Sequence, residues 1–201
     1  HDLQSALRAD SPDAPSTHAE AAKIGEPWLE AELKEFNNHT SNGSWEIIKL
    51  ADKPPGRRLH KFVWVFKVKR DGTAKARLCV QGCTLQSGID YDQTFSATLR
   101  YSSARALFAY AAKCGCEIRS IDYVAAYLQG DFIEGETVYC HMPPGYEKCD
   151  EAGKPYVCKI LKPIYGIPQA GRRLQRKVSP WMVETMKLRQ LDDSDACVFV
   201  Y

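Results

Sequence analysis

The amino-acid sequence predicts an α+β fold in which a mixed or antiparallel sheet packs against helices. Apolar alternation typical of strands, longer segments with helical periodicity, and hairpin signals in place of regular βαβ alternation support this class. The chain has 201 residues, of which 44% are hydrophobic and 26% charged, and a formal charge of +2. This composition excludes collagenous, broadly disordered and transmembrane proteins, and it allows one large domain or two small ones.

The first part of the chain is polar, so we expect residues 1–26 to form a flexible lead-in. The sequence begins with His1 and shows no signal peptide, which indicates a piece of a longer, intracellular protein. Pro27 suits the first turn of a helix that ends near Asn37 and Asn38, because apolar side chains recur on one face of this segment.

Three strands are expected next, over residues 45–50, 62–69 and 75–81, since each combines β-branched or aromatic side chains with turn signals at its ends. Asp71 and Gly72 predict a tight hairpin between the last two.

Ser102 is placed to cap a helix that continues through Ala111. Residues 117–122 are expected to form a strand that ends at Asp122, followed by a helical turn over 124–128. The remaining expected elements are strands over 137–142 and 156–161, a helix over 170–186 and a strand beginning at residue 197.

Eight cysteines are present, and we expect them to be reduced, because no secretory signal occurs and the chain is long enough to form a core without bridges. The close pairs Cys79/Cys83 and Cys114/Cys116 lack a second pair, or histidines, at zinc-ligand spacing. The spacing therefore disfavours a structural zinc site.

Charge is distributed unevenly along the chain. Residues 1–50 carry 4 basic and 9 acidic side chains, whereas residues 53–119 carry 13 basic and 4 acidic ones. Residues 53–77 hold nine basic side chains against Asp71 alone. This stretch is a candidate phosphate-facing surface, although a solvated strand face has the same composition.

Short motifs follow one another in a characteristic order from about residue 19 to residue 201. They are Trp28…Glu32, Trp45-Glu46, Val63-Trp64-Val65-Phe66-Lys67-Val68-Lys69, Lys75-Ala76-Arg77-Leu78, Gly88-Ile89-Asp90-Tyr91, Thr94-Phe95-Ser96, Asp122…Ala126-Tyr127-Leu128, Tyr139…Pro144-Gly145-Tyr146 and Tyr165-Gly166-Ile167…Gln169. Each motif is weak alone, but the collinear series is specific. Together they resemble the copia-type retrotransposon reverse transcriptase, an RNA-directed DNA polymerase.

The resemblance implies a right-hand polymerase fold, with a lead-in over residues 1–19 and with the fingers and the first part of the palm over 20–201. It implies a place in a Pol polyprotein that adds deoxynucleoside triphosphates to a DNA primer on an RNA template, with two Mg²⁺ ions and no membrane. The family works in cytoplasmic particles before its DNA reaches the nucleus.

The same resemblance makes Asp122 the first metal ligand, and a carboxylate is a ligand that magnesium prefers. Read without the motif, this aspartate is more typical of a helix cap. Tyr127 stands where the family places an aromatic ring that excludes a ribose 2′-hydroxyl, and its alternative is a core tyrosine.

Lys69 and Arg77 flank the predicted hairpin and are candidates for the triphosphate, with Arg77 favoured for bidentate contacts; either is alternatively a surface residue. Gln169 matches a family position that contacts the nucleotide or the template beside it, and its alternative is a loop amide that caps the next helix. Arg172, Arg173 and Arg176 follow near helical spacing and are candidate template or primer contacts, or an exposed basic helix face.

Several departures from the family pattern occur. The Tyr-x-Asp-Asp turn that supplies two further metal-binding aspartates is not present, and Asp192-Asp193 precedes the strand that should carry it. Smaller departures are Leu174 for a tryptophan, Ala97 for a proline and Cys83 for an aromatic residue.

We therefore expect this fragment alone to be inactive and to work as part of a longer polymerase. A non-catalytic nucleic-acid-binding remnant of a decayed element is the alternative, and a scaffold protein fits only if nucleic-acid binding is absent.

Overall fold

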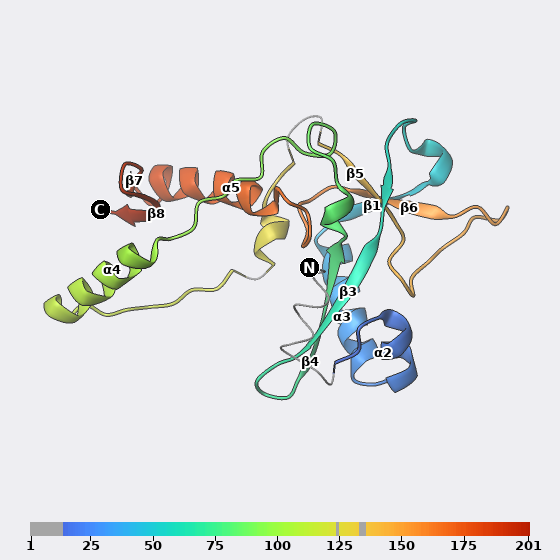
Figure 1. Cartoon of the computed structure of the whole chain (residues 1–201), viewed down its shortest axis with the longest axis horizontal. Helices are drawn as coiled ribbons and strands as arrows, with labels where there is room; N and C mark the ends of the chain where they lie inside the picture. Colours follow the sequence, from blue (N-terminus) through green and yellow to red (C-terminus); the bar gives the residue numbers. More distant parts are fainter. Residues whose placement is uncertain (1–13, 124, 133–135) are drawn as a thin grey trace.

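The computed structural model describes residues 14–123, 125–132 and 136–201 of the chain. Helices and strands are mixed along these residues, which confirms the predicted α+β class (Figure 1). The helices are α2 (His18–Ile24), α3 (Trp28–Ser41), α4 (Tyr101–Cys114) and α5 (Ala170–Glu184), with 3₁₀ turns η1 (Leu50–Asp52), η2 (Gly82–Thr84) and η3 (Ala126–Gln129). The strands are β1 (Trp45–Lys49), β2 (Leu59–His60), β3 (Phe62–Val68), β4 (Ala74–Val80), β5 (Val138–His141), β6 (Tyr156–Ile160), β7 (Arg189–Leu191) and β8 (Asp195–Val200).

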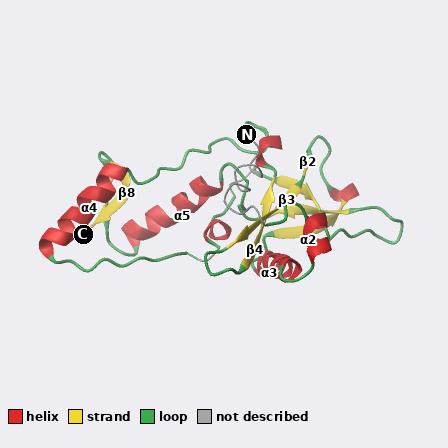
Figure 2. Cartoon of the chain, turned by 60° about the horizontal axis from the view of Figure 1, so that its bottom comes forward, coloured by secondary structure: helices red, strands yellow, loops and turns green. Residues whose placement is uncertain are grey.

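The largest sheet within the described residues has four strands in the order β1-β6-β5-β2. β6 pairs antiparallel with β1 and with β5, whereas β2 and β5 are parallel, so the sheet is mixed. The hairpins β3–β4 and β7–β8 form two further antiparallel pairs. Helix α4 and the β7–β8 hairpin lie at one end of the molecule, and the four-stranded sheet lies at the other (Figure 2).

The β3–β4 hairpin carries much of the core on one of its faces. Because side chains alternate along a strand, Phe62, Trp64 and Phe66 share a face, and each is at most 5% exposed. The Trp28 ring of α3 meets the Phe66 ring edge-on, with ring centroids 5.7 Å apart. Burial of one such side chain contributes roughly 1.5–3 kcal/mol to folding, so this face anchors the hairpin firmly.

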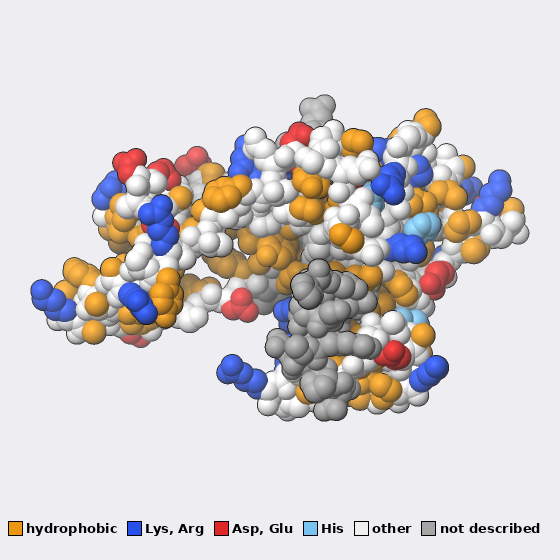
Figure 3. Space-filling model, in the orientation of Figure 1, with side chains coloured by type: hydrophobic (Ala, Val, Ile, Leu, Met, Phe, Trp, Pro, Cys, Tyr) orange, Lys and Arg blue, Asp and Glu red, His pale blue; other side chains and the backbone are white. Residues whose placement is uncertain are grey.

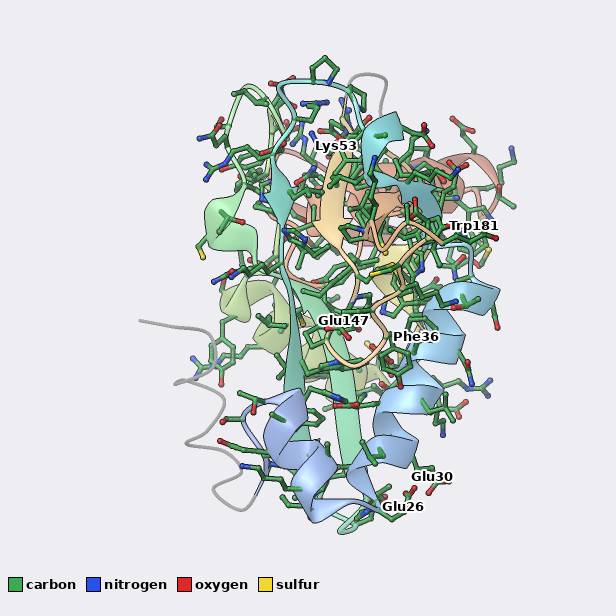
Figure 4. All side chains as sticks on the ribbon, turned by 90° about the vertical axis from the view of Figure 1, so that its right-hand side faces the viewer. Glu26, Glu30, Phe36, Lys53, Glu147 and Trp181 are labelled. Atoms are coloured by element: carbon green, nitrogen blue, oxygen red, sulfur yellow. The ribbon has the colours of Figure 1, made fainter. Side chains whose placement is uncertain are left out.

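The Pro144-Gly145-Tyr146 motif forms the junction between β3 and α3. The Trp64 indole N–H donates to the Pro144 carbonyl over 3.0 Å, and the Tyr146 ring stacks on Phe36 at a centroid distance of 4.1 Å. Figure 4 shows α3 beside the β3–β4 hairpin. The Phe36 side chain of α3 lies toward the segment that carries Glu147. This motif therefore contributes to packing.

Most expected elements occur within a few residues of their predicted limits, but one helix was not expected and the cap of another was predicted wrongly. Helix α2 lies within the segment predicted to be an irregular lead-in, and the Thr17 side chain caps it by accepting from the Glu20 N–H. The predicted Ser102 cap is wrong, because α4 begins at Tyr101 without a side-chain cap from its own N-cap residue. The Asp195 carboxylate of β8 instead accepts from the Arg100 N–H over 2.9 Å.

The predicted strand over residues 117–122 is also wrong, because this segment has no regular secondary structure. A strand is stabilised by hydrogen bonds to a neighbouring strand, and within the described residues no strand pairs with this segment. Ile118 and Ile121 are 60% and 82% exposed, so no core holds the segment either.

Helix α4 carries exposed apolar side chains, including Leu107, Phe108 and Tyr110, and none of its residues is buried. The space-filling view shows hydrophobic side chains at this end of the molecule (Figure 3). Among the described residues, no helix is long and apolar enough to cross a membrane. All eight cysteines are free thiols.

Candidate nucleotide site

The second face of the β3–β4 hairpin carries the basic side chains. Ala76, Leu78 and Val80 of β4 point into the core, so the alternating positions Lys75 and Arg77 lie on the opposite face, where both are half-buried. The pairing register sets Lys75 opposite Lys67 and Arg77 opposite Val65. The hairpin thus presents cations on a rigid scaffold.

Two residues predicted for the nucleotide site meet on one aromatic ring. The Arg77 guanidinium carbon lies 5.3 Å from the centre of the Tyr165 ring, and the Tyr127 ring meets the same ring edge-on, with centroids 5.1 Å apart. Arg77 belongs to β4 and Tyr127 to η3, whereas Tyr165 precedes α5. The three side chains form one cluster although they are far apart in the sequence.

The positive charges of Lys69, Lys75 and Arg77, on and beside the ring contacts of Tyr165, repel one another. Partial burial lowers the pKa of Lys75, and the positive charges of Arg77 and Lys69 lower it further, whereas the carboxylates of Glu35 and Asp122 act in the opposite direction. We name Lys69, Lys75 and Arg77 the basic cluster. A bound anion would relieve the repulsion within it, because an opposite charge favours the charged form of a lysine.

Lys69 and Lys75 border a groove between α3 and β4. The groove has a volume of about 490 Å³, and Lys34 and Glu35 of α3 line its other side. Lys69 is exposed at the hairpin turn, where its N–H donates to the Thr73 carbonyl over 2.9 Å. These two lysines therefore lie beside open space.

Asp122 is exposed and lies in the irregular segment before η3. Its carboxylate is one of the two negative charges that oppose the lowering of the Lys75 pKa. Within the described residues, no group of three or more histidine, cysteine, aspartate or glutamate side chains is arranged to hold a metal ion. Asp122 alone does not form a site for two magnesium ions, so the described residues do not fit a complete metal centre.

The turn that presents Tyr127 begins with an unusual backbone. Ala125, the N-cap of η3, has a φ of +50°, in the left-handed region. The neighbouring Leu128 is 3% exposed and fixes the turn to the core. The predicted helical turn at 124–128 is thus present as η3, with residue 124 outside the described residues.

Gln169 lies at the N-terminus of α5 and is fully buried. Its Nε2 donates to the Asp90 carbonyl over 3.2 Å, and its Oε1 has no partner among the described residues. The amide holds the Gly88-Ile89-Asp90-Tyr91 segment against α5, and it is not exposed on the face that carries Arg77.

The three arginines predicted to contact template or primer have different surroundings. Arg172 donates to the Phe95 carbonyl over 3.0 Å, whereas Arg176 is exposed. Arg173 is 3% exposed, and its Nε donates to the Glu136 carboxylate over 2.9 Å while Nη2 donates to the second oxygen. This buried, bidentate pair joins α5 to the segment before β5.

Sequence reasoning did not assign Lys75 or Tyr165 to the site. The sequence contains a signal for Lys75, because residues two apart on a strand share a face and Arg77 is a predicted site residue. Tyr165 was part of a family motif, but its contacts with β4 and η3 depend on tertiary structure.

Comparison with known proteins identifies the family. The sequence profile described as reverse transcriptase (RNA-dependent DNA polymerase) matches residues 42–200. The chain is 35% identical over 177 residues to the retrovirus-related Pol polyprotein from transposon TNT 1-94 of Nicotiana tabacum, which covers 85% of this chain and 13% of that protein.

More distant relatives agree with this result. Identity is 30% over 189 residues to the Pol polyprotein from transposon RE2 of Arabidopsis thaliana, covering 92% of this chain and 12% of the relative. It is 26% over 190 residues to the transposon Ty1-NL2 Gag-Pol polyprotein of Saccharomyces cerevisiae, covering 93% and 10%. No solved structure matches the chain at a significant level. The chain spans about an eighth of the first of these relatives, and it belongs to the reverse transcriptase family of copia/Ty1-type retrotransposon Pol polyproteins.

Proposed function

We propose that this chain forms the fingers and the first part of the palm of an RNA-directed DNA polymerase, and that it binds the deoxynucleoside triphosphate that is added to the primer. The observation that carries this proposal is the meeting of Arg77 and Tyr127 on the Tyr165 ring, beside the basic cluster. A nucleotide has a polyanionic triphosphate and a sugar. The basic cluster offers cations to the triphosphate, and the Tyr127 ring offers an aromatic edge to the sugar.

Within this site, the residues have distinct roles. Arg77 forms bidentate contacts with the phosphates, and Lys69 and Lys75 add point charges. The Tyr127 ring excludes a ribose 2′-hydroxyl and so favours deoxynucleotides. Gln169 retains one acceptor without a partner among the described residues, and this acceptor is available to a nucleotide if the Asp90 segment moves.

Asp122 supplies one metal ligand in the proposed enzyme. Its carboxylate is exposed and interacts electrostatically with Lys75, which suits a position beside a triphosphate. Two Mg²⁺ ions, when bound, would supply charge stabilisation for phosphoryl transfer. Since no three or more potential ligands are grouped together among the described residues, the longer polyprotein would have to complete the site.

The RNA template and DNA primer would pass along α5. Arg176 is exposed on this helix, and Arg172 lies about one helical turn before it in α5. Arg173 acts in this proposal through its pair with Glu136, which orients the helix. Backbone contacts of this kind predict binding that weakens steeply with salt and depends little on sequence. The polyprotein would work in cytoplasmic particles.

The experiment uses a longer polyprotein that contains this chain, with primed RNA as template. Asp122→Asn is expected to abolish DNA synthesis while primed-RNA binding stays within about twofold, because the exposed basic side chains of α5 that would contact the template are unchanged. Asp193→Asn, in the exposed turn before β8, is the matched control and is expected to retain synthesis. Synthesis by the Asp122→Asn protein at the unmodified rate would refute the metal assignment.

The alternative is a nucleic-acid-binding protein without catalysis, and the excess of basic side chains between residues 53 and 119 favours it equally well. It predicts salt-dependent RNA binding by this chain and no nucleotide incorporation by the longer polyprotein under any metal condition. Template-dependent incorporation by the longer polyprotein excludes it.

A further inference from the structure

Tyr165 lies in the short segment between β6 and α5, and this segment is fixed against β4. The flanking Ile164 and Ile167 are 0% and 4% exposed. The Val80 N–H donates to the Tyr165 carbonyl over 2.8 Å. Gly166 has a φ of +89°, and a Cβ at this position would lie 2.0 Å from the Val80 carbonyl oxygen. The backbone that carries the tyrosine ring is therefore in direct contact with the strand that carries Arg77.

The Tyr165 ring contacts two side chains that have different proposed partners on the nucleotide. Its face receives the Arg77 guanidinium at 5.3 Å from the ring centre. The Tyr127 ring meets it at 74° and 5.1 Å, an edge-to-face geometry that aromatic pairs favour. One fixed ring thus lies between the cation for the phosphates and the ring for the sugar.

The ring, and not the hydroxyl, makes these contacts. Among the described residues, none forms a hydrogen bond with the Tyr165 hydroxyl, and none forms a salt bridge with Arg77. Partial burial raises the pKa of Tyr165, so the side chain stays neutral. Contact with a ring face orients a guanidinium without using its N–H donors, which remain free for an anion.

We propose that Tyr165 is a positioning residue that couples phosphate binding by Arg77 to sugar selection by Tyr127. This inference rests on the proposed function and adds a residue to it. Tyr165 does not contact the nucleotide; it holds Arg77 and Tyr127 at a fixed separation, so that a triphosphate seated on Arg77 brings its sugar against the Tyr127 ring.

The test measures binding of dATP and of ATP to the full 201-residue chain by titration calorimetry at low salt. These ligands differ only in the 2′-hydroxyl, so the ratio of their dissociation constants reports sugar selection. Tyr165→Leu removes the ring, and Tyr165→Phe keeps it. Tyr110→Leu, on the exposed face of α4, is the matched control, since that side chain is 65% exposed.

We expect Tyr165→Leu to weaken dATP binding about three- to tenfold and to bring the ATP/dATP ratio close to one, as loss of one cation–π and one aromatic contact implies. Tyr165→Phe and Tyr110→Leu should match the unmodified chain. In an Arg77→Ala background, Tyr165→Leu should weaken dATP binding by a smaller factor than in the unmodified chain, because the cation–π contact with Arg77 is already absent and only the contact with Tyr127 is lost. A purely structural role would give additive losses.

The outcomes separate the two proposals. Binding of dATP that Tyr165→Leu leaves unchanged, equal losses in the Leu and Phe variants, or additive losses with Arg77→Ala each overturn the role of Tyr165 alone. Absence of dATP binding to the unmodified chain overturns the proposal that this chain binds the nucleotide, and the role of Tyr165 with it. If Tyr165→Leu lowers the unfolding midpoint strongly, Tyr165→Met, which fills similar space flexibly, takes its place in the same comparison.

Discussion

Replacing Arg173 with methionine is expected to destabilise the fold strongly, because it breaks a buried ion pair. The side chains of Arg173 and Glu136 are 2% and 5% exposed, and two guanidinium nitrogens donate to the two carboxylate oxygens. Methionine fills similar volume but leaves the Glu136 carboxylate buried without a partner. Removal of one member of such a pair costs about 3–5 kcal/mol of unfolding free energy.

Urea unfolding followed by circular dichroism measures this loss. The double variant Arg173→Met/Glu136→Leu should recover most of the stability, since replacing a buried pair with apolar side chains is often neutral. Arg176→Met, at an exposed position of the same helix, controls for the substitution and should change the free energy by less than about 0.5 kcal/mol. A loss below about 1 kcal/mol for Arg173→Met, or an equal loss in the double variant, would refute the argument from burial.

Three further predictions concern the rest of the fold. Burial lowers the pKa of His60, with Asp90 opposing the shift and Arg58 adding to it, so the unfolded chain takes up a proton near the ordinary value of 6.5 that the folded chain does not. The contribution of His60 to the free energy of unfolding should therefore be full above this pH and decrease as the pH falls below it. Urea unfolding at a series of pH values measures this dependence, and His60→Gln should reduce it. Gly166→Ala should lower the unfolding free energy by more than about 1 kcal/mol, because the added Cβ would lie 2.0 Å from a β4 carbonyl; Gly153→Ala, also at positive φ but with nothing within 4 Å, should lose less in the same assay. Timed labelling with a thiol reagent and mass spectrometry should separate two groups of cysteines: the exposed Cys83, Cys114, Cys116 and Cys149, which react in the native chain, and the buried Cys79, Cys140 and Cys158, which react only after unfolding.

The β3–β4 hairpin shows what sequence patterns predict well. Its strands occur at 62–68 and 74–80, each within a residue of the expected limits. Alternating side chains and an Asp71-Gly72 turn are local features of the sequence. They determine the hairpin through interactions between residues that are close together in the chain. Helix α5 is local in the same sense and begins at Ala170 as expected.

Residues 117–122 show why other predictions failed. Their alternation is compatible with a strand, but a strand exists only where another strand supplies hydrogen bonds, and none does so here within the described residues. The predicted cap of α4 was wrong for a related reason. The carboxylate that accepts from the Arg100 N–H belongs to Asp195, which is distant in the sequence.

The sequence by itself determined the family, the α+β class, most helices and strands, and the basic strand that carries Arg77, because order of motifs, periodicity and charge are properties of the chain. Only the tertiary structure decided which candidates share a surface. It brings Arg77 and Tyr127 to the Tyr165 ring, and it buries Gln169 and Arg173 in contacts with distant segments. The physical reason is that burial and ring contacts depend on which segments pack together, and a local pattern records only that a side chain is suited to such a contact.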